Sequence, residues 1–294
     1  MILYYFYRCV EWFLMLLPRS WRKVFFIFLS KVAFFIDTKH RRVILQNLHF
    51  ALGHDFSPKA EEEISRYCYR NLMLAILQVL ENRHQSAEEL ALHVSFANRH
   101  IVDDALKEGR RIIFISAHYG NWELGATALS TLVVPTHATY KKLNNPYFES
   151  YLLESRSKLG MNMIEKRGAI RGLTRAIKNA ETISFLVDQN VSKKDGIVVN
   201  FFGKTIRQTA APAFLARKYD ALIIPLFIAT DDEEHYKITF EKPIEVKKSD
   251  DAQKDILEAT QKQADVVEKI IKENPKFWFW CHRRFKTEHP EIYT

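Results

Sequence analysis

The sequence predicts an α/β fold in which helices flank a largely parallel sheet. Three short runs have the apolar, β-branched composition of buried strands, and stretches with helical periodicity alternate with them. The strand-like runs are 111–117, 182–187 and 222–229, and the helical stretches lie near 122–132, 146–159, 169–180 and 209–219. This alternation is typical of a parallel sheet covered by helices.

The first 36 residues differ in composition from the rest. Residues 2–17 and 24–36 are almost entirely apolar, and Pro18 with a basic turn at 19–23 separates them. Neither run reaches the ~20 uninterrupted apolar residues of a spanning helix. We expect a hydrophobic helical membrane anchor at 1–37 that lies in the bilayer interface or spans it with charges at the surface. The alternative is a buried core hairpin.

The basic residues around these runs, at 19–23 and 39–42, predict that this side of the membrane is cytoplasmic. A cleaved signal peptide is not expected, because the extreme N-terminus lacks a basic region. No internal repeat or flexible linker follows, so we expect one catalytic domain at 38–294.

Three further segments complete the expected architecture. Ser57 as N-cap, Pro58 at the first helical position and a regular apolar stripe predict a core-facing helix over 57–80. Residues 235–246 are typical of a hairpin or of edge strands, since Pro243 suits an edge. Residues 250–274 have the pattern of a long surface helix.

Charge and composition restrict the class of partner. The formal net charge is +8 and the pI is near 9.2, which favours nucleic acid, a membrane surface or an acidic carrier protein. No RRM, KH, zinc-finger or helix-turn-helix pattern is present, so nucleic acid is not the expected partner. Cys9, Cys68 and Cys281 are far apart, and their spacing indicates neither a disulfide framework nor a metal site. P-loop, Rossmann, serine-hydrolase and zincin motifs are also missing.

The run from His118 to Glu123 is the strongest candidate for a catalytic motif. It follows strand 111–117, and open α/β sheets bind ligands at the carboxyl ends of their strands. Gly120 supplies a turn and Asn121 is a good N-cap. The Glu123 carboxylate could accept a hydrogen bond from the N–H of one imidazole nitrogen of His118, which would leave the other nitrogen free as a base. We therefore predict a catalytic His118–Glu123 pair; a capped helix with a satisfied histidine is the alternative.

Polar residues in other loops are candidates for substrate binding. Asp188 and Gln189 follow strand 182–187, where they could hold a polar head group or form a simple turn. Lys141 and Lys142 precede Asn145, and ammonium groups beside a helix N-terminus suit a phosphate. Asn145 is equally explained as an N-cap before Pro146.

The arginines at 156 and 167 and the aromatic segment 277–286 each allow two interpretations. Arg156 and Arg167 belong to a series of arginines between the first two strands, where they either bind substrate or serve as solvated surface charge. Residues 277–286 combine aromatic rings with basic side chains, which suits either a membrane interface or a segment packed on the core.

Taken together, these motifs resemble the bacterial lipid A late acyltransferases nearly end to end. The resemblance is carried by the apolar N-terminus, His118 to Glu123, Asn145-Pro146 followed by Arg156, Asp188-Gln189, Phe201-Phe202-Gly203 with 209–216, and Trp280 to Phe285. Asn200 departs from the pattern, since many members have proline there. The resemblance implies a glycerolipid-acyltransferase-like fold at the cytoplasmic face of the bacterial inner membrane.

The resemblance also implies a reaction. A fatty acyl chain would move from an acyl carrier protein thioester to a hydroxyl of a lipid A precursor, with no metal or organic cofactor and no nucleic acid. His118 would act as general base, and Glu123 would fix its tautomer. Lys141, Lys142, Asn145, Arg156, Arg167, Asp188 and Gln189 would bind substrate. A lysophospholipid acyltransferase and a non-catalytic basic membrane- or nucleic-acid-binding protein remain as alternatives.

Overall fold

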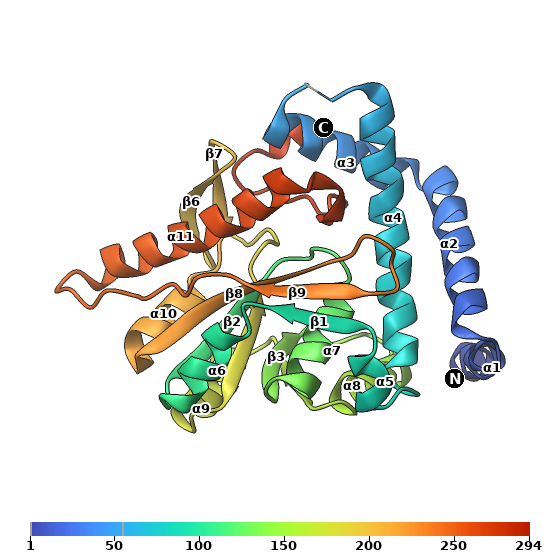
Figure 1. Ribbon diagram of the computed structural model, residues 1–294. Helices are drawn as coiled ribbons and strands as arrows, with labels where there is room; N and C mark the ends of the chain where they lie inside the picture. The colour runs from blue at the N-terminus through green and yellow to red at the C-terminus, as the bar shows by residue number, and fades with distance from the viewer. Residues whose placement is uncertain (1, 55) are drawn as a thin grey trace.

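The computed structural model describes residues 2–54 and 56–294, which form a seven-stranded sheet with helices on both faces (Figure 1). The strand order is β1-β9-β8-β2-β5-β3-β4. The strands are β1 Val94–Ala97, β2 Arg111–Ser116, β3 Thr136–Tyr140, β4 Met161–Glu165, β5 Thr182–Leu186, β8 Ala221–Ala229 and β9 Tyr236–Phe240, and β6 Ile197–Phe201 and β7 Lys204–Gln208 form a separate hairpin.

The helices follow the strands in the expected alternation. In chain order they are α1 Ile2–Met15, α2 Arg19–Ile36, α3 Thr38–Leu52, α4 Pro58–Glu81, α5 Ala87–Ala91, α6 His100–Lys107, α7 Trp122–Leu132, α8 Pro146–Ser157, α9 Ala169–Lys178, α10 Ala211–Tyr219 and α11 Ala252–Glu273, with the 3-10 helices η1 Pro275–Phe277 and η2 Pro290–Tyr293. The predicted helices at 57–80 and 250–274 correspond to α4 and α11.

The predicted parallel sheet is confirmed. The three expected strands are β2, β5 and β8, and they lie side by side because β2 pairs in parallel with both β5 and β8. Beyond β5, strands β3 and β4 extend the parallel sheet. The sequence patterns did not predict β3 and β4, which are short and mix polar with apolar residues. Residues 235–246 form neither a hairpin of their own nor an edge strand: the segment contains the single strand β9, which runs antiparallel to β8. Strand β1 covers the other side of β9, and Pro243 lies beyond it.

Alternate residues of the central strands supply the two halves of the core. Ile112 and Phe114 of β2 belong to the cluster under α5, α6 and α7, whereas Ile113 and Ile115 belong to the cluster under α9, α10 and α11. Each fully buried aliphatic side chain contributes about 1.5–3 kcal/mol. The buried strands fix the positions of the loops that follow them.

Helix α4 connects the sheet with the N-terminal helices. Ser57 caps it by accepting a hydrogen bond from the Ala60 backbone N–H, as its sequence predicts. One side of α4 packs against α2 and another against α7 (Figure 1). The side chain of Asn71 donates to the Gly120 carbonyl oxygen at 2.6 Å, so α4 also fixes the loop before α7.

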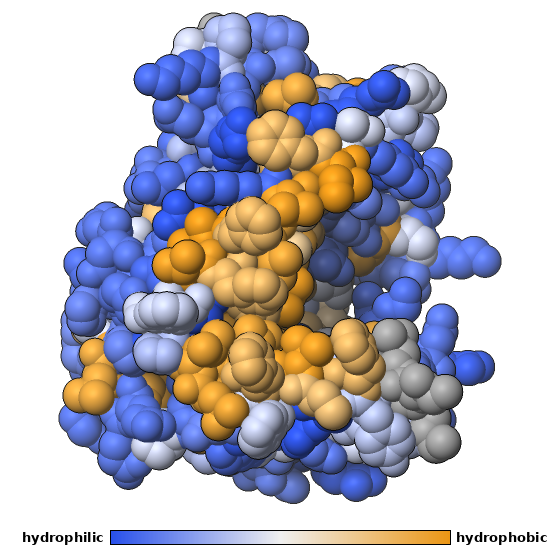
Figure 2. Space-filling view, turned by 90° about the vertical axis from the view of Figure 1, so that its right-hand side faces the viewer, coloured by the Kyte–Doolittle hydropathy of each residue, from blue (hydrophilic) through white to orange (hydrophobic). Residues whose placement is uncertain are grey.

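Helices α1 and α2 carry a largely apolar surface. Phe26, Ser30 and Phe34 of α2 are buried toward the protein. Figure 2 shows the apolar side chains gathered in one band on this face. Those that are exposed include Trp12, Phe13, Leu16, Trp21, Val24, Phe28, Phe35 and Ile36. In the part of the chain that the structure describes, no helix combines the length and the apolar character needed to cross a membrane.

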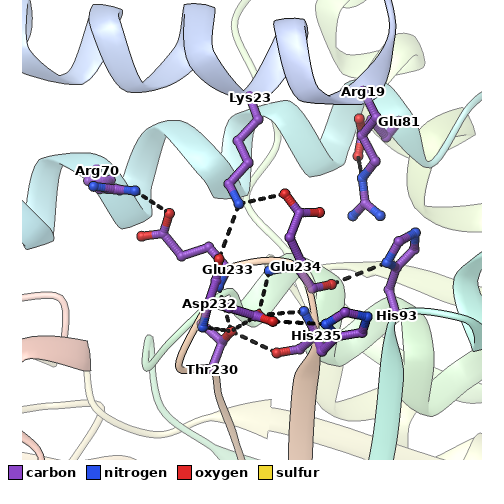
Figure 3. Close-up of polar contacts among 10 residues, drawn as sticks. All are labelled: Arg19, Lys23, Arg70, Glu81, His93, Thr230, Asp232, Glu233, Glu234 and His235. Carbon is purple, nitrogen blue, oxygen red and sulfur yellow. Dashed lines mark hydrogen bonds and ion pairs between the residues drawn. The ribbon is translucent and has the colours of Figure 1, made fainter.

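Ion pairs hold α2 and α4 to the loop between β8 and β9. Lys23 of α2 donates to the Glu234 carboxylate at 2.7 Å and to the Asp232 carbonyl oxygen at 3.2 Å (Figure 3). Arg70 of α4 pairs with Glu233 at 2.5 Å. The two helices are thus attached through opposite charges to the same loop of the sheet.

Candidate active site

The candidate site lies at the carboxyl ends of β2, β3 and β5. The loop after β2 contains His118 and turns sharply at Gly120, where φ is +56°. Asn121 accepts a hydrogen bond from the Leu124 backbone N–H and so caps α7, as predicted. A Cβ atom at position 120 would lie 2.0 Å from the Ile228 carbonyl oxygen, so only glycine fits where this loop crosses β8.

Asp188, from the loop after β5, is the carboxylate that contacts His118. The His118 Nδ1 atom lies 2.9 Å from Asp188 Oδ1, and the His118 backbone N–H donates to Oδ2 at 2.9 Å. The indole N–H of Trp278 also donates to Oδ2, at 2.8 Å. Burial alone raises the pKa of Asp188, but the charge of His118 and these hydrogen bonds outweigh burial and lower the pKa to about 2. An ionised Asp188 holds the proton of His118 on Nδ1 and leaves Nε2 as the basic nitrogen.

The expected contact between His118 and Glu123 is not the one that forms. Glu123 instead makes two hydrogen bonds with Arg156 of α8, from Nε at 3.1 Å and from Nη2 at 2.5 Å. As the first-turn residue of α7, Glu123 faces α8, whereas the loop directs His118 toward β5. The structure therefore gives the tautomer-fixing contact to Asp188, which the sequence had suggested only as a substrate-binding residue.

A pocket of about 340 Å³ opens beside His118, between the sheet and α7. Its polar lining includes His118, Glu123, Arg156, Lys141 and Gln189. The remaining lining is mainly apolar and includes Phe114, Trp122, Leu129, Met161, Met163, Leu226 and Ile228. Polar groups at one part of an otherwise apolar pocket suit a ligand with a reactive head and a hydrocarbon body.

Strand register explains the shape of this pocket. Phe114, Ser184 and Ala138 are consecutive partners across β2, β5 and β3, and Met163 of β4 continues the same row. All four line the pocket. The row lies two residues below Ser116, which corresponds to ~7 Å of strand. The pocket therefore extends from the strand ends down along one face of the sheet.

The C-terminal segment holds the Asp188 loop in place. Trp278 donates to Asp188, and the His282 Nε2 atom accepts the Asn190 backbone N–H at 2.8 Å. Arg284, only 1% exposed, donates to the Gln189 carbonyl oxygen at 2.8 Å and to the Arg207 carbonyl oxygen at 2.7 Å. The sequence left open whether residues 277–286 lie at a membrane interface or pack on the core. For these three side chains, packing on the core is observed.

Burial controls the protonation of two residues in this segment. Desolvation is the main cause that lowers the pKa of His282 to about 4, so its imidazole is neutral and can accept the Asn190 N–H. Desolvation also lowers the pKa of Arg284 to about 10, which still leaves the guanidinium charged at neutral pH.

The other predicted binding residues divide into two groups. Lys141 and Gln189 line the pocket, and the Gln189 side-chain nitrogen lies 3.2 Å from His118 Nε2. Lys142, Asn145 and Arg167 do not line it. Asn145 caps α8 by accepting backbone N–H groups of the next residues, which is the structural role that its sequence position predicted.

Sequence reasoning missed several residues of the site. Lys166 lines the pocket, directly after β4, and its position could have been found only by predicting that strand. The contacts of Trp278, His282 and Arg284 gave no local signal, because their partners lie about ninety positions earlier in the chain.

Comparison with known proteins places this geometry in context. The family model described as bacterial lipid A biosynthesis acyltransferase matches residues 1–287. A lipid A biosynthesis acyltransferase of Haemophilus influenzae is 24% identical over 255 residues, which cover 85% of this chain and 79% of that protein. A lipid A biosynthesis palmitoleoyltransferase of Escherichia coli is 27% identical over 185 residues, covering 62% and 58% respectively. A lipid A biosynthesis lauroyltransferase of E. coli is 24% identical over 188 residues, covering 63% and 60%.

The crossing of the His118 loop over β8 gives a test with an internal control. Gly120→Ala adds a Cβ that collides with the Ile228 carbonyl oxygen, whereas Gly109→Ala adds one in open space at a similar positive φ of +66°. Left-handed backbone at alanine costs about 1–2 kcal/mol at both positions. We expect Gly120→Ala to lower the urea unfolding free energy by at least about 2 kcal/mol more than Gly109→Ala does. Equal losses would contradict the close crossing.

His282 predicts a pH dependence of stability. Its folded pKa of about 4 is below the ordinary value of 6.5, so the unfolded chain binds a proton more readily between these two pH values. The unfolding free energy should therefore fall as the pH drops from about 6.5 to 4, by up to about 3 kcal/mol. Asp188 adds a further loss of stability only below about pH 3.8, because its folded pKa is lowered from that ordinary value to about 2.

The variant His282→Gln separates this contribution from that of other groups. Glutamine keeps an oxygen acceptor for the Asn190 N–H and does not titrate. Urea unfolding curves from pH 7 to pH 4 should show a smaller loss of stability for the variant than for the wild type. Parallel curves would show that His282 does not titrate with folding.

Proposed function

We propose that this protein moves a fatty acyl group from an acyl carrier protein thioester to a hydroxyl of a lipid A precursor, because it belongs to the family of bacterial lipid A biosynthesis acyltransferases. The observation that carries this proposal is the position of His118, whose Nδ1 contacts a buried carboxylate while Nε2 lies at an apolar pocket. A base beside a hydrocarbon-sized pocket suits acyl transfer to a hydroxyl.

His118 acts as general base in the proposed reaction. The acceptor hydroxyl replaces the exposed Gln189 amide as the hydrogen-bond donor to His118 Nε2. As the hydroxyl oxygen attacks the thioester carbonyl carbon, Nε2 takes its proton. The tetrahedral intermediate then collapses, the carbon–sulfur bond breaks, and the imidazolium returns the proton to the thiolate. The products are an ester and the free carrier thiol.

Asp188 and Arg156 have separate supporting roles. Asp188 fixes the tautomer of His118 and stabilises the imidazolium that forms during transfer. Arg156 uses Nε and Nη2 to bind Glu123, so its other N–H groups can donate to the oxygen that becomes negative in the intermediate. Glu123 then acts as a positioning residue for Arg156.

The apolar part of the pocket binds the donor acyl chain. Its lining by Leu129, Met161 and Met163 removes hydrocarbon from water, and its depth limits how long the chain can be. Small residues of the sheet row, Ala138 and Ser184, leave the space that the chain occupies.

Basic residues around the pocket provide the binding surface for negative charge. Lys141 and Lys142 follow β3, and Lys166 and Arg167 follow β4, which pairs with β3 through Tyr140 and Glu165. Because the two strands pair up to their last residues, these four side chains lie at the same edge of the sheet. All four are exposed. They suit the phosphates of a lipid A precursor or the acidic surface of a carrier protein.

In this proposal the N-terminal helices hold the site at a membrane surface. The exposed apolar face of α1 and α2 in Figure 2 lies in the bilayer interface, with the helices parallel to it. An apolar cleft of about 820 Å³ between the two helices adds to this face. The proposed location is the cytoplasmic face of the bacterial inner membrane, where both substrates meet.

A reaction with purified components tests the activity. We expect acyl carrier protein thioester and a lipid A precursor to give a product whose mass increases by one acyl chain. A lysophospholipid acceptor tests the alternative glycerolipid activity in parallel. Transfer to the lysophospholipid alone would overturn the acceptor, and no thioester turnover with either acceptor would overturn the enzymatic proposal.

Three substitutions test the assignment of roles. His118→Ala should lower kcat by about 10²- to 10⁴-fold because the base is lost. Asp188→Asn should lower it by at least about 10²-fold, because an amide can donate to Nδ1 and fix the wrong tautomer. Glu123→Gln should have a smaller effect, about tenfold, since Arg156 keeps a neutral partner.

The pH–rate profile distinguishes the two carboxylates. Loss of the anion beside the imidazole should move the acidic limb of the kcat/KM profile in Asp188→Asn, but not in Glu123→Gln. Asp104→Asn, which alters an exposed pair with Lys107, serves as the control with unchanged kinetics. A shifted limb in Glu123→Gln, with an unshifted one in Asp188→Asn, would restore Glu123 as the partner of His118.

Two opposite substitutions test the acyl pocket. Ala138→Leu fills the row between Ser184 and Met163, and should favour a shorter acyl donor over a longer one. Met163→Ala enlarges the pocket and should favour the longer donor. The ratio of kcat/KM for the two donors should change on the order of tenfold in opposite directions. Unchanged ratios in both variants would place the acyl chain elsewhere.

A further inference from the structure

A second groove, of about 570 Å³, lies between the end of α2, the start of α3 and the start of α4. It shares no lining residue with the active-site pocket. The side chains that matter here are Phe34 of α2, Arg41 and Arg42 of α3, and Ser65 and Arg66 of α4. Cationic and apolar groups thus meet in one concave surface.

Two buried hydrogen-bond donors in this groove have no partner within the described residues. They are Nε of Arg41 and the hydroxyl of Ser65, a residue that is only 4% exposed. Buried polar groups in proteins are nearly always hydrogen-bonded, because an unpaired one is destabilising. Two such donors lining the same groove therefore indicate a ligand that supplies acceptor oxygens.

The charge of the groove indicates that this ligand is an anion. The guanidinium groups of Arg41 and Arg66 lie over the same Phe34 ring, 4.9 and 4.4 Å from its centre. The two carboxylates of the groove already have partners, since Glu62 pairs with Arg66 at 2.6 Å and Glu61 contacts His49 at 2.7 Å. Arg41 and Arg42 form no ion pair within 2–54 and 56–294, so the groove carries excess positive charge.

We propose that this groove binds the phosphate of an anionic phospholipid headgroup. Guanidinium forks and a hydroxyl are the donors that phosphate oxygens accept most readily. Phe35, which lines the groove, and Ile36 lie at the end of α2 and are 64% and 75% exposed, so they continue the exposed apolar surface of that helix. A lipid whose chains contact this face can place its headgroup over Arg41. The site rests on the membrane contact proposed for α2, and not on acyl transfer.

Binding of the full-length protein to vesicles tests the site. Vesicles of phosphatidylcholine alone are compared with vesicles that also contain phosphatidylglycerol. Arg41→Gln removes the guanidinium fork, which lies over the Phe34 ring, but keeps a polar side chain; it should weaken binding to the anionic vesicles by about tenfold or more. Ser65→Ala changes no charge and should weaken it about threefold, without loss of thermal stability in the absence of lipid.

Lys31→Gln is the control for general electrostatic attraction, because Lys31 is an exposed residue of α2 that does not line the groove. Loss of one such charge should weaken binding by at most about fivefold. The proposal is overturned if Arg41→Gln matches Lys31→Gln while Ser65→Ala binds like wild type. It is also overturned if millimolar inorganic phosphate stabilises the wild type, but not the two variants, in the absence of lipid; the site would then bind a free anion.

Two readouts separate this proposal from its premises. Binding to pure phosphatidylcholine vesicles reports the apolar contact of α1 and α2, and should be the same in all variants. If the wild type binds neither kind of vesicle, the lipid assignment fails together with that contact. Acyl transfer to detergent-dispersed acceptor should be unchanged in all three variants, so a failure of the proposed function would be seen independently.

Discussion

The buried carboxylate of Asp188 is the group on which the geometry of the site depends. It is 5% exposed, and a carboxylate that loses its water must be compensated by hydrogen bonds or it takes up a proton. Three donors, from His118 and Trp278, provide that compensation. Because one small group accepts from the loop after β2 and from the C-terminal segment, its charge fixes three separate parts of the chain relative to one another.

The register of the sheet makes this convergence possible. Ser116 at the end of β2 is paired with Leu186 at the end of β5, so the two loops begin at the same level. Neighbouring parallel strands therefore bring His118 and Asp188 together although they are 70 positions apart. The same regularity brings Lys141 and Lys142 after β3 beside Lys166 and Arg167 after β4. The carboxyl edge of the sheet thus brings together the His118–Asp188 pair and the exposed basic side chains after β3 and β4.

Much of this arrangement could be predicted from local sequence patterns. Buried apolar strands, the caps at Ser57, Asn121 and Asn145, and the position of His118 after a strand all depend on interactions within a few residues. The short mixed strands β3 and β4 could not be recognised, since their pairing stabilises them more than their composition does. The N-terminal apolar runs were recognised as helices, but their sequence left open whether they form a membrane anchor or a buried core hairpin.

The identity of the carboxylate beside His118 could not be decided in this way. Glu123 is close in sequence and its charge suits the role, so a local reading favours it over Asp188. Its engagement by Arg156 depends on where α8 lies relative to the start of α7, which no periodicity reveals. The cationic groove at Arg41 was hidden for the same reason, because α2, α3 and α4 each supply only part of it.

The position of the clamping residues has a consequence for how the protein is made. Trp278, His282 and Arg284 follow every strand of the sheet in sequence. During synthesis on the ribosome, the sheet can therefore form before the chain contains the groups that hold Asp188 and its loop. Until those three residues dock, the carboxylate lacks the indole donor and the loop lacks the buried guanidinium. Assembly of an ordered site is consequently a late event, because it waits for residues that follow the last strand of the sheet.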